Sequence, residues 1–445
     1  MQTYDKYKDS GIAWIGEIPE HWEIMKLKYS CRKEPYFIKT GPFGSQLKGE
    51  DLKDDGDVRV YSQRNVIDSS FSEVKYYVTN AKAKALKSFY TKSNDVLITS
   101  RGTIGKAAML PKNEENGILH PCLIALRNDN KIIDRNYLLY FINEFNGFKL
   151  NIKLESNATT IEVIYTETLK NIRLIVPPLN VQKQIVSYLD KKCADIDKVI
   201  ATQQRRIELL QELKQSTITH AVTRGLNPNV KMKDSGVEWI GEVPEHWNTL
   251  RLRFVCELRN GYTPSKANPD FWSEGTIPWY RMEDIRESGR RLNEAKQYIT
   301  ESAIKGGGLF EAGSFIMATT ATIGEHAVLI VDSLANQQFT NLKIRKSLSH
   351  SDFNAFFFQY LFVVDDYCKT TTKTATFPAV NMEDLKNFIV CIPPLDEQKI
   401  ILTYLDKRCA ELDNSISKAQ KEIDLLQEYK QALITEVVTG KRKVC

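Results

Sequence analysis

The chain has 445 residues, more than one compact core usually holds, so two domains are expected. A hydrophobic content of 42% predicts a folded protein, and the net charge of +5 is compatible with nucleic-acid contact without requiring it. No apolar run approaches the roughly 20 residues that cross a bilayer, and the start has no apolar signal stretch. We therefore expect a cytoplasmic protein with no membrane contact.

An internal repeat begins near the N-terminus. Residues 8–29 (KDSGIAWIGEIPEHWEIMKLKY) return as residues 233–254 (KDSGVEWIGEVPEHWNTLRLRF), with 13 of 22 positions identical. Residues 177–222 return as residues 393–438, with 25 of 46 positions identical. The order is constant block, variable segment and constant helix, twice over. This order predicts two different recognition segments on one duplicated frame with pseudo-two-fold symmetry.

The first variable segment has a mixed α/β pattern. Residues 95–100, 121–127 and 171–176 are predicted strands, and residues 136–145 form a predicted amphipathic helix. Its loops are rich in Gln, Ser, Arg, Asn and Thr, the side chains that contact base edges and phosphates, although polar loops are usually only solvated. The candidate contacts are Ser45, Gln46, Lys48, Ser62, Gln63, Arg64, Asn65, Ser100, Arg101, Thr103, Lys106, Thr159 and Thr160.

A long helix is predicted next, from residue 181 to residue 222. Neither proline nor glycine interrupts it, and Gly225 followed by Pro228 predicts where it ends. Its apolar residues alternate in steps of four and three, which is typical of a coiled coil. The seam comprises Leu189, Ile196, Ile200, Ile207 and Leu210, with Cys193 and Gln203 between them.

The second variable segment repeats the α/β pattern with different loops. Strands are predicted at 314–319, 326–331, 339–345 and 387–392, and a helix at 353–362. The anchor GTIG (102–105) of the first segment returns here as ATIG (321–324). The candidate contacts are Tyr262, Thr263, Ser265, Lys266, Tyr280, Arg281, Thr319, Thr320, Thr322, Thr374 and Thr376.

The second long helix carries the same seam, at Leu405, Leu412, Ile416, Ile423 and Leu426. Each helix could pack only on its own domain, but the two identical stripes favour an intramolecular coiled coil of the two copies. Only 16 residues (223–238) join the first helix to the second domain, a reach of at most ~55 Å. A helix of 42 residues is about 60 Å long, so antiparallel pairing is predicted.

The sequence offers little catalytic chemistry. It has neither a Gly-x-x-x-x-Gly-Lys-Ser/Thr phosphate loop nor a G-x-G-x-x-G turn. The Pro-Pro pairs at 177 and 393 lack the Asn/Asp before and the aromatic after that an amino-methyltransferase motif uses, and they are read as helix starts. His21 and His246 stand in the repeated PEHW and are expected to be structural or partner-docking residues. Eight scattered cysteines without CxxC spacing are expected to be structural thiols.

With these features the chain resembles the specificity subunit of type I restriction–modification systems. The resemblance rests on W-I-G-E-[IV]-P-E-H-W opening each half, the GTIG/ATIG anchor, and L-K-N before each [VI]-P-P-L. The stretch GYTPSKANPDFW (261–272) is typical of target recognition domains of that family. One departure is Val181, which stands where the second copy has Glu397, so P-L-x-E-Q is lost in the first copy.

The resemblance implies a non-catalytic DNA reader. Two α/β (α+β) target recognition domains would each bind half of a bipartite asymmetric site in double-stranded DNA, joined by two long antiparallel coiled-coil helices that set the gap. Methyltransferase subunits, expected to number two, and restriction subunits would dock on the constant regions. S-adenosylmethionine, ATP and magnesium would belong to those partners, so this chain is expected to have no catalytic, cofactor or metal residue.

The expected domains follow the repeat. They are a first recognition domain at 1–176 with its constant block at 8–29, a spacer helix at 177–226, a linker and second recognition domain at 227–392 with its constant block at 233–254, and a second spacer helix with a basic tail at 393–445. Two other classes of function stay open at this stage. They are a stand-alone methyltransferase or endonuclease, and a coiled-coil adaptor without a DNA role.

Overall fold

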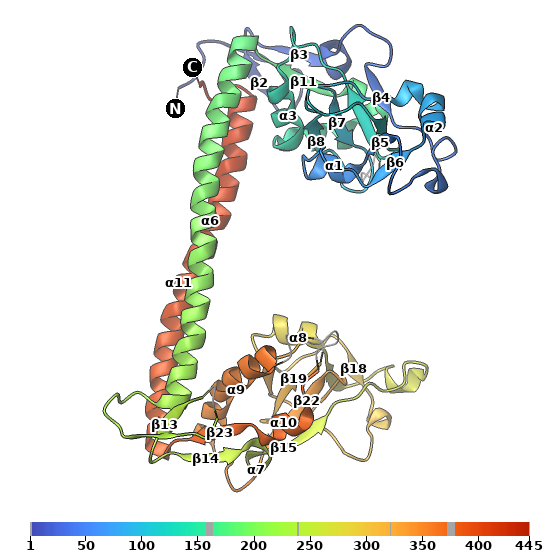
Figure 1. Cartoon of the computed structure of the whole chain (residues 1–445). Coiled ribbons are helices and arrows are strands. Elements are labelled where there is room, and N and C mark those ends of the chain that lie inside the picture. Colours follow the sequence, from blue (N-terminus) through green and yellow to red (C-terminus); the bar gives the residue numbers. More distant parts are fainter. Residues whose placement is uncertain (1, 157–162, 238–239, 321, 372–378, 445) are drawn as a thin grey trace. The chain divides into compact units, whose positions relative to one another are not determined.

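The computed structural model describes residues 2–156, 163–237, 240–320, 322–371 and 379–444 (Figure 1). The chain divides into two compact units. Unit 1 is Met1–Gln203 with Lys421–Cys445, and unit 2 is Gln204–Gln420. Each unit therefore contains one variable segment and a part of both long helices. The units combine distant segments because the ends of both long helices are buried in the same cores as the variable segments. The expected boundaries at 176, 226 and 392 stay a prediction.

Unit 1 is built on a four-stranded antiparallel sheet of order β4-β10-β7-β8 and a three-stranded sheet of order β6-β5-β9. Two further strand pairs, β1-β2 and β3-β11, come from the constant block and the end of the segment. The strands are β1 (Tyr7–Asp9), β2 (Glu17–Pro19), β3 (Glu23–Lys26), β4 (Ile38–Thr40), β5 (Val58–Tyr61), β6 (Tyr76–Val78), β7 (Val96–Thr99), β8 (Ala107–Met109), β9 (Ile118–Leu119), β10 (Leu123–Leu126) and β11 (Arg173–Val176). The helices are α1 (Gln63–Ile67), α2 (Asn80–Ala85), α3 (Arg135–Asn143), α4 (Asn146–Ser156) and α5 (Thr166–Asn171).

The central strands of this sheet are covered on both faces. All four residues of β7 and of β10 are buried, as expected for continuous apolar runs. Successive side chains point to opposite faces, so Val96 and Ile98 join the core under α3, and Leu97 joins a separate core with Val66 of α1. The predicted helix at 136–145 is thereby confirmed as the cover of one face.

Unit 2 repeats this plan with a longer sheet, of order β15-β22-β19-β20-β17, and a three-stranded sheet of order β18-β16-β21. Strand pairs β12-β13 and β14-β23 correspond to β1-β2 and β3-β11. Its strands are β12 (Met232–Asp234), β13 (Glu242–Pro244), β14 (Asn248–Arg251), β15 (Cys256–Asn260), β16 (Ile277–Tyr280), β17 (Arg291–Leu292), β18 (Tyr298–Ile299), β19 (Phe315–Ala318), β20 (His326–Leu329), β21 (Leu334–Ala335), β22 (Phe339–Ile344) and β23 (Ile389–Ile392). Its helices are α7 (Leu252–Val255), α8 (Met282–Glu287), α9 (Ser351–Thr371) and α10 (Met382–Asn387).

The two long helices are α6 (Leu179–Arg224) and α11 (Leu395–Val438), of 46 and 44 residues. In unit 1, Lys430 Nζ of α11 lies 2.8 Å from Asp197 of α6. In unit 2, Lys214 Nζ of α6 lies 2.7 Å from Asp413 of α11. The repeat offset of 216 positions relates the two pairs to each other, since it takes Asp197 to Asp413 and Lys214 to Lys430. From the first pair to the second, residue numbers rise along α6 and fall along α11. The predicted antiparallel pairing is confirmed.

The predicted seam is buried or half-buried along its whole length. Leu189, Ile196, Leu405, Leu412 and Ile423 are 8% exposed or less. The remaining seam residues, Ile200, Ile207, Leu210, Ile416 and Leu426, are half-buried. Residues one step off the seam, such as Leu209 and Leu425, are exposed by 49% and 55%. The periodicity of the sequence therefore identified the face that each helix turns to its partner.

Each helix ends against the tryptophan of a constant block. Gly225 has a φ of +73°, which terminates α6 as predicted, and a Cβ at this residue would lie 3.1 Å from the Trp247 ring. Gly440 has a φ of +75° after α11, and its Cβ would lie 2.9 Å from the Trp22 ring. The constant block of each unit thus packs on the end of the helix that arrives from the other half of the sequence. No helix among the described residues has the length and apolarity needed to cross a membrane.

Candidate nucleic-acid interface

In unit 1, three loops leave the sheets at one end. The Gly41 amide donates to Leu123 O at 2.9 Å, and the Ser100 amide donates to Cys122 O at 2.8 Å. The His120 amide donates to Tyr61 O at 3.0 Å. The ends of β4, β7 and β5 therefore meet the start of β10, and the loops 41–48, 100–106 and 120–122 emerge beside helix α1. Most candidate residues of the first segment lie in these loops.

A hydrogen bond joins α1 to the turn at 101–106. Gln63 Nε2 donates to Thr103 O at 3.3 Å, and the turn passes under this amide at Gly102, where φ is +68°. Arg101, Thr103 and Lys106 are exposed on the turn. Arg64 is exposed over 85% of its side chain and pairs with Asp68 at 3.2 Å. Three cationic side chains from two elements are thus brought to one surface.

Three candidates of unit 1 are buried, which argues against direct contact with a ligand. Asn65 is 5% exposed; its Oδ1 accepts from the Ser62 amide at 2.9 Å, and its Nδ2 donates to Ser70 O and Glu73 O. This use of both amide atoms caps α1 and holds the following turn. Ser62 and Ser100 are 9% and 1% exposed. The side chains of Ser62 and Asn65 therefore hold the loop, whereas the Ser100 hydroxyl is buried without a hydrogen-bond partner among the described residues. Ser45, Gln46 and Lys48, in contrast, are exposed.

Unit 2 has the same convergence of strand ends. The Gly261 amide donates to Phe339 O at 2.8 Å, and the Thr319 amide donates to Gln338 O at 2.8 Å. The Asn336 amide donates to Tyr280 O at 3.1 Å. The loop 261–266, the turn after β19 and the loop before β22 therefore emerge beside α8, as their counterparts do beside α1. The two segments present different residues from equivalent positions.

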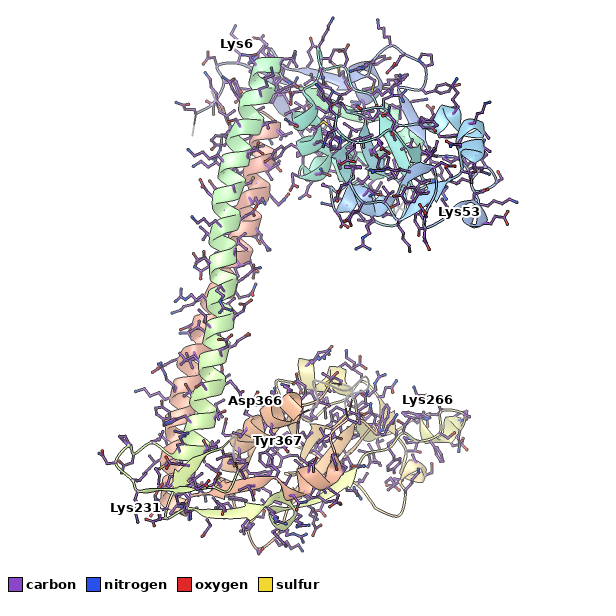
Figure 2. The ribbon with its side chains drawn as sticks, viewed as in Figure 1. Lys6, Lys53, Lys231, Lys266, Asp366 and Tyr367 are labelled. Carbon is purple, nitrogen blue, oxygen red and sulfur yellow. The ribbon has the colours of Figure 1, made fainter. Side chains whose placement is uncertain are left out.

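The candidate contact residues of unit 2 also divide into exposed and buried ones. Ser265 and Lys266 are exposed, and Figure 2 shows Lys266 on a peripheral loop of this unit. Tyr280 is fully buried, its hydroxyl pKa raised by that burial, and Thr319 is 5% exposed and bonded to Thr340. Both therefore belong to the interior, and direct contact is not expected of them.

The remaining candidates of this unit are half-buried. Arg281 forms an ion pair with Glu283, and Thr320 and Thr322 lie on the turn after β19. The Tyr262 hydroxyl accepts from the Lys305 amide at 2.9 Å and donates to Ala303 O at 3.2 Å. The Tyr262 side chain therefore holds the neighbouring loop. Thr159, Thr160, Thr374 and Thr376 lie outside the described residues.

Two residues that the sequence reading passed over lie among these loops. His120 is half-buried before β10 and stacks on Tyr76 at 6.3 Å between ring centroids. Gln337 is exposed in the equivalent loop of unit 2 and hydrogen-bonds the Thr263 hydroxyl. Burial lowers the pKa of His120. For Gln337, the signal available in the sequence was the polar run Asn336-Gln337-Gln338 directly before a predicted strand.

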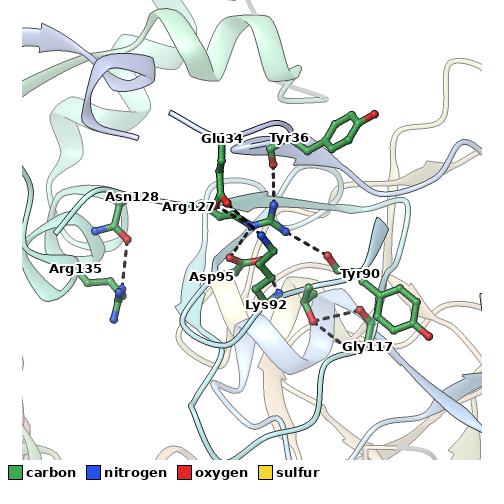
Figure 3. Close-up of polar contacts among 10 residues, drawn as sticks. Glu34, Tyr36, Tyr90, Lys92, Asp95, Gly117, Arg127, Asn128 and Arg135 are labelled. Carbon is green, nitrogen blue, oxygen red and sulfur yellow. Dashed lines mark hydrogen bonds and ion pairs between the residues drawn. The ribbon is translucent and has the colours of Figure 1, made fainter. Parts of the chain in front are cut away.

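The opposite end of the unit 1 sheet shows an arginine committed to the fold (Figure 3). Arg127 Nε lies 3.1 Å from Asp95 Oδ1, and its terminal nitrogens donate to Tyr36 O and Tyr90 O. Its side chain is only 11% exposed. The Asp95 pKa is raised because burial outweighs the Lys92 amide and Arg127, which stabilise its charged form. This arginine ties three segments together and has no free donor edge comparable with that of Arg64.

The surfaces that these loops form in unit 1 and in unit 2 differ in charge. Arg64 of unit 1 corresponds to Glu283 of unit 2, counted from the residue that caps each short helix, and Lys106 corresponds to Glu325 in the GTIG/ATIG alignment. A shared backbone therefore carries cations at two positions in one unit and carboxylates in the other. No cluster of three metal-binding side chains occurs in the ranges that the structure describes.

Comparison with known proteins identifies the family that has this architecture. A family model described as the type I restriction modification DNA specificity domain matches residues 19–211 and 244–424, one match in each half of the sequence. The chain belongs to this family of type I specificity subunits. Its alignment with the EcoprrI specificity subunit of Escherichia coli is 39% identical and covers 44% of this chain and 52% of that one. The putative type I restriction enzyme MjaX specificity subunit of Methanocaldococcus jannaschii is 26% identical over 97% of this chain and 96% of its own length.

Solved structures support the same fold. A chain from work on complex assembly and conformational transition of the type I restriction–modification system aligns with a TM-score of 0.67 at 18% identity, covering 95% of this chain and 98% of that one. The HsdS subunit of Thermoanaerobacter tengcongensis aligns with a TM-score of 0.51 at 16% identity, covering 96% and 98%. The predicted tandem α/β recognition domains with long helices are confirmed by these matches.

Proposed function

We propose that this specificity subunit reads a bipartite asymmetric DNA site, one half with each unit, and has no catalytic activity of its own. The observation that carries this proposal is the pair of equivalent loop clusters, which share hydrogen-bonded strand ends but differ in exposed side chains. Two copies of one binding frame with different side chains suit a site whose two halves differ in sequence.

The helices and constant blocks have a separate role in this proposal. The helices, about 69 Å and 66 Å long at 1.5 Å per residue, set the number of base pairs between the half-sites. Methyltransferase subunits, two per chain, and restriction subunits dock on the repeated regions, because a repeated surface can bind the same partner twice. S-adenosylmethionine, ATP and magnesium belong to those partners.

Gel shift on a random duplex library tests the DNA-binding part. The purified chain, alone and with its methyltransferase subunits, should enrich a two-part sequence with a constant gap. Retention of every duplex alike, with a steep dependence on salt, would indicate phosphate contact only and contradict the proposal. No retention in either mixture would favour the adaptor alternative.

The absence of catalysis is tested by calorimetry. The chain alone should release no heat of binding with S-adenosylmethionine, and should neither methylate nor cleave DNA. The matched positive control is the assembled complex with methyltransferase subunits. Binding of the cofactor to the isolated chain at micromolar concentration would favour the stand-alone methyltransferase.

A further inference from the structure

The two constant blocks differ at one hydrogen-bonding position. In unit 2, Glu397 on the first turn of α11 accepts from both PEHW side chains, with Oε1 on His246 Nε2 and Oε2 at 2.9 Å from Trp247 Nε1. In unit 1 the corresponding residue of α6 is Val181. Trp22 is fully buried, and its Nε1 has no hydrogen-bond partner in the part of the chain that the structure describes. Buried indole N–H groups normally have one.

Much of the surrounding frame is the same in both units, but in unit 1 the Tyr4 ring also packs on the His21 and Trp22 rings, at 5.5 Å between ring centroids in each case. Gln182 Nε2 donates to Pro177 O at 2.7 Å, and Gln398 Nε2 donates to Pro393 O at 2.8 Å, which places the first helical turns alike. The Trp22 and Trp247 amides donate to Pro19 O and Pro244 O at 2.9 and 3.0 Å. Each indole also packs on a helix-ending glycine. Position 181 is therefore where a carboxylate would meet Trp22 Nε1.

A cavity of about 530 Å³ lies at this place in unit 1. Its lining includes His21 and Val181 together with Tyr4, Asp5, Lys6, Glu20 and Lys443. Figure 2 shows Lys6 beside the start of α6. Lys6 and Lys443 are cationic, Asp5 and Glu20 are anionic, and neither lysine has an ion pair within the described ranges. The Lys443 ammonium lies 5.8 Å from the centre of the Tyr4 ring.

We propose that this cavity binds an aspartate or glutamate side chain of a methyltransferase subunit, whose carboxylate meets His21 as Glu397 meets His246 in unit 2. The inference rests on the proposed function, because it deepens the docking of that partner. The repeat itself points to a carboxylate, since the same His-Trp pair binds one through both oxygens in unit 2. Lys6 and Lys443 can pair with an incoming carboxylate, while Asp5 and Glu20 balance their charge in the lining.

The test uses Val181→Glu in the full chain, with Val181→Leu as the matched control. An internal glutamate should occupy the site and weaken binding of the methyltransferase subunit about tenfold or more, whereas leucine should change it less than about twofold. Equal affinities of the two variants would overturn the inference. Failure of the unsubstituted chain to bind the subunit at all would instead count against the proposed function.

A second measurement reads the site directly. In a chain with ¹⁵N-labelled tryptophan, the Trp22 Nε1–H signal, assigned with Trp22→Phe, should shift when the methyltransferase subunit is added. In Val181→Glu it should already be shifted without the partner. Glu397→Val calibrates the effect, because it removes the carboxylate from Trp247. A Trp22 signal that the partner leaves unmoved, or one already at its shifted position in the isolated unsubstituted chain, would overturn the inference.

Discussion

Arg64 is an exposed cation of the unit 1 loop cluster, with 85% of its side chain accessible. Among the described residues its one ion-pair partner is Asp68. Such an exposed ion pair contributes at most about 1 kcal/mol, so the Arg64 guanidinium is available to a ligand. If it binds a guanine edge, Arg64→Ala should weaken specific binding by about 1–3 kcal/mol and relax one base position in one half-site. If it binds phosphate, affinity should fall evenly across sequences with a shallower salt dependence.

Selection from a random library at two salt concentrations distinguishes these outcomes for Arg64→Ala. Arg205→Ala is the matched control, because Arg205 is also an exposed arginine paired along a helix, with Glu208 at 2.7 Å. That control should bind as the unsubstituted chain does. An Arg64→Ala variant with unchanged affinity and sequence preference would remove Arg64 from the interface.

His120 makes the stability of unit 1 depend on pH. Burial lowers its pKa below the ordinary 6.5, so between the two values the unfolded chain binds more protons than the folded one. Stability from this group is therefore present above about pH 6.5 and lost as the pH falls through that window. Thermal melting at pH 7.5 and pH 5.5 should show a smaller loss for His120→Asn than for the unsubstituted chain. An equal loss in both would contradict this assignment.

The reactivity of the cysteine thiols depends on their burial. Burial raises the pKa of Cys31 and of Cys368 to about 12, so both remain protonated and unreactive near neutral pH. The expectation of structural thiols holds for these residues. Their burial depends on strands and helices far away in the chain, which is why spacing alone could exclude a CxxC site but could not rank the reactivity of individual cysteines.

At the scale of the element, the seam of the long helices should be sensitive to charge. Leu426→Asp in unit 1 and Ile207→Asp in unit 2 place a carboxylate on the half-buried face and should cost roughly 2–4 kcal/mol. Circular dichroism during thermal melting measures the loss. Leu425→Asp is the control, since Leu425 is 55% exposed one residue away and should change stability by less than about 0.5 kcal/mol. Similar melting of Leu426→Asp and Leu425→Asp would contradict the seam.

The helices and strands were the part of the fold that the sequence predicted best. The strand at 95–100 became β7 at Val96–Thr99, and the helix at 353–362 became the longer α9, Ser351–Thr371. The extension of α9 was missed because its apolar pattern weakens after Val364, where Asp365 and Asp366 follow. Asp365 is nevertheless buried beside His326, a contact between elements that local periodicity does not reveal.

At the scale of the whole molecule, the recognition segments should be exchangeable. Replacing residues 255–386 with the same segment of a related specificity subunit should change one half of the recognised sequence and leave the other intact. The reason is that the diverged loops and the repeated helices are separate parts of the sequence. Sequencing of methylated sites in cells that carry the complex measures the result. A replacement that altered both halves, or neither, would contradict the assignment of one half-site to each unit.

The candidate contacts show where sequence reasoning reaches its limit. Polar composition selected Arg64 and Arg101, which are exposed, and also Asn65 and Tyr280, which are buried. These residue types look alike in a loop sequence because a polar side chain can either meet a ligand or satisfy nearby backbone groups. The hydrogen bonds of Asn65 to Ser70 and Glu73 decide between these uses, and they form only in the folded turn.

The sequence by itself determined the duplication, the element types and the antiparallel helix pair. Each of these depends on patterns repeated along the chain, namely identity at a constant offset, apolar periodicity and the length of a linker. Tertiary structure alone decided that the units combine distant segments, that the loops 41–48, 100–106 and 120–122 meet at one sheet end, and that Trp22 lacks the carboxylate that Trp247 has. Burial and hydrogen bonding between residues far apart in sequence leave no periodic pattern, because they depend on how finished elements pack.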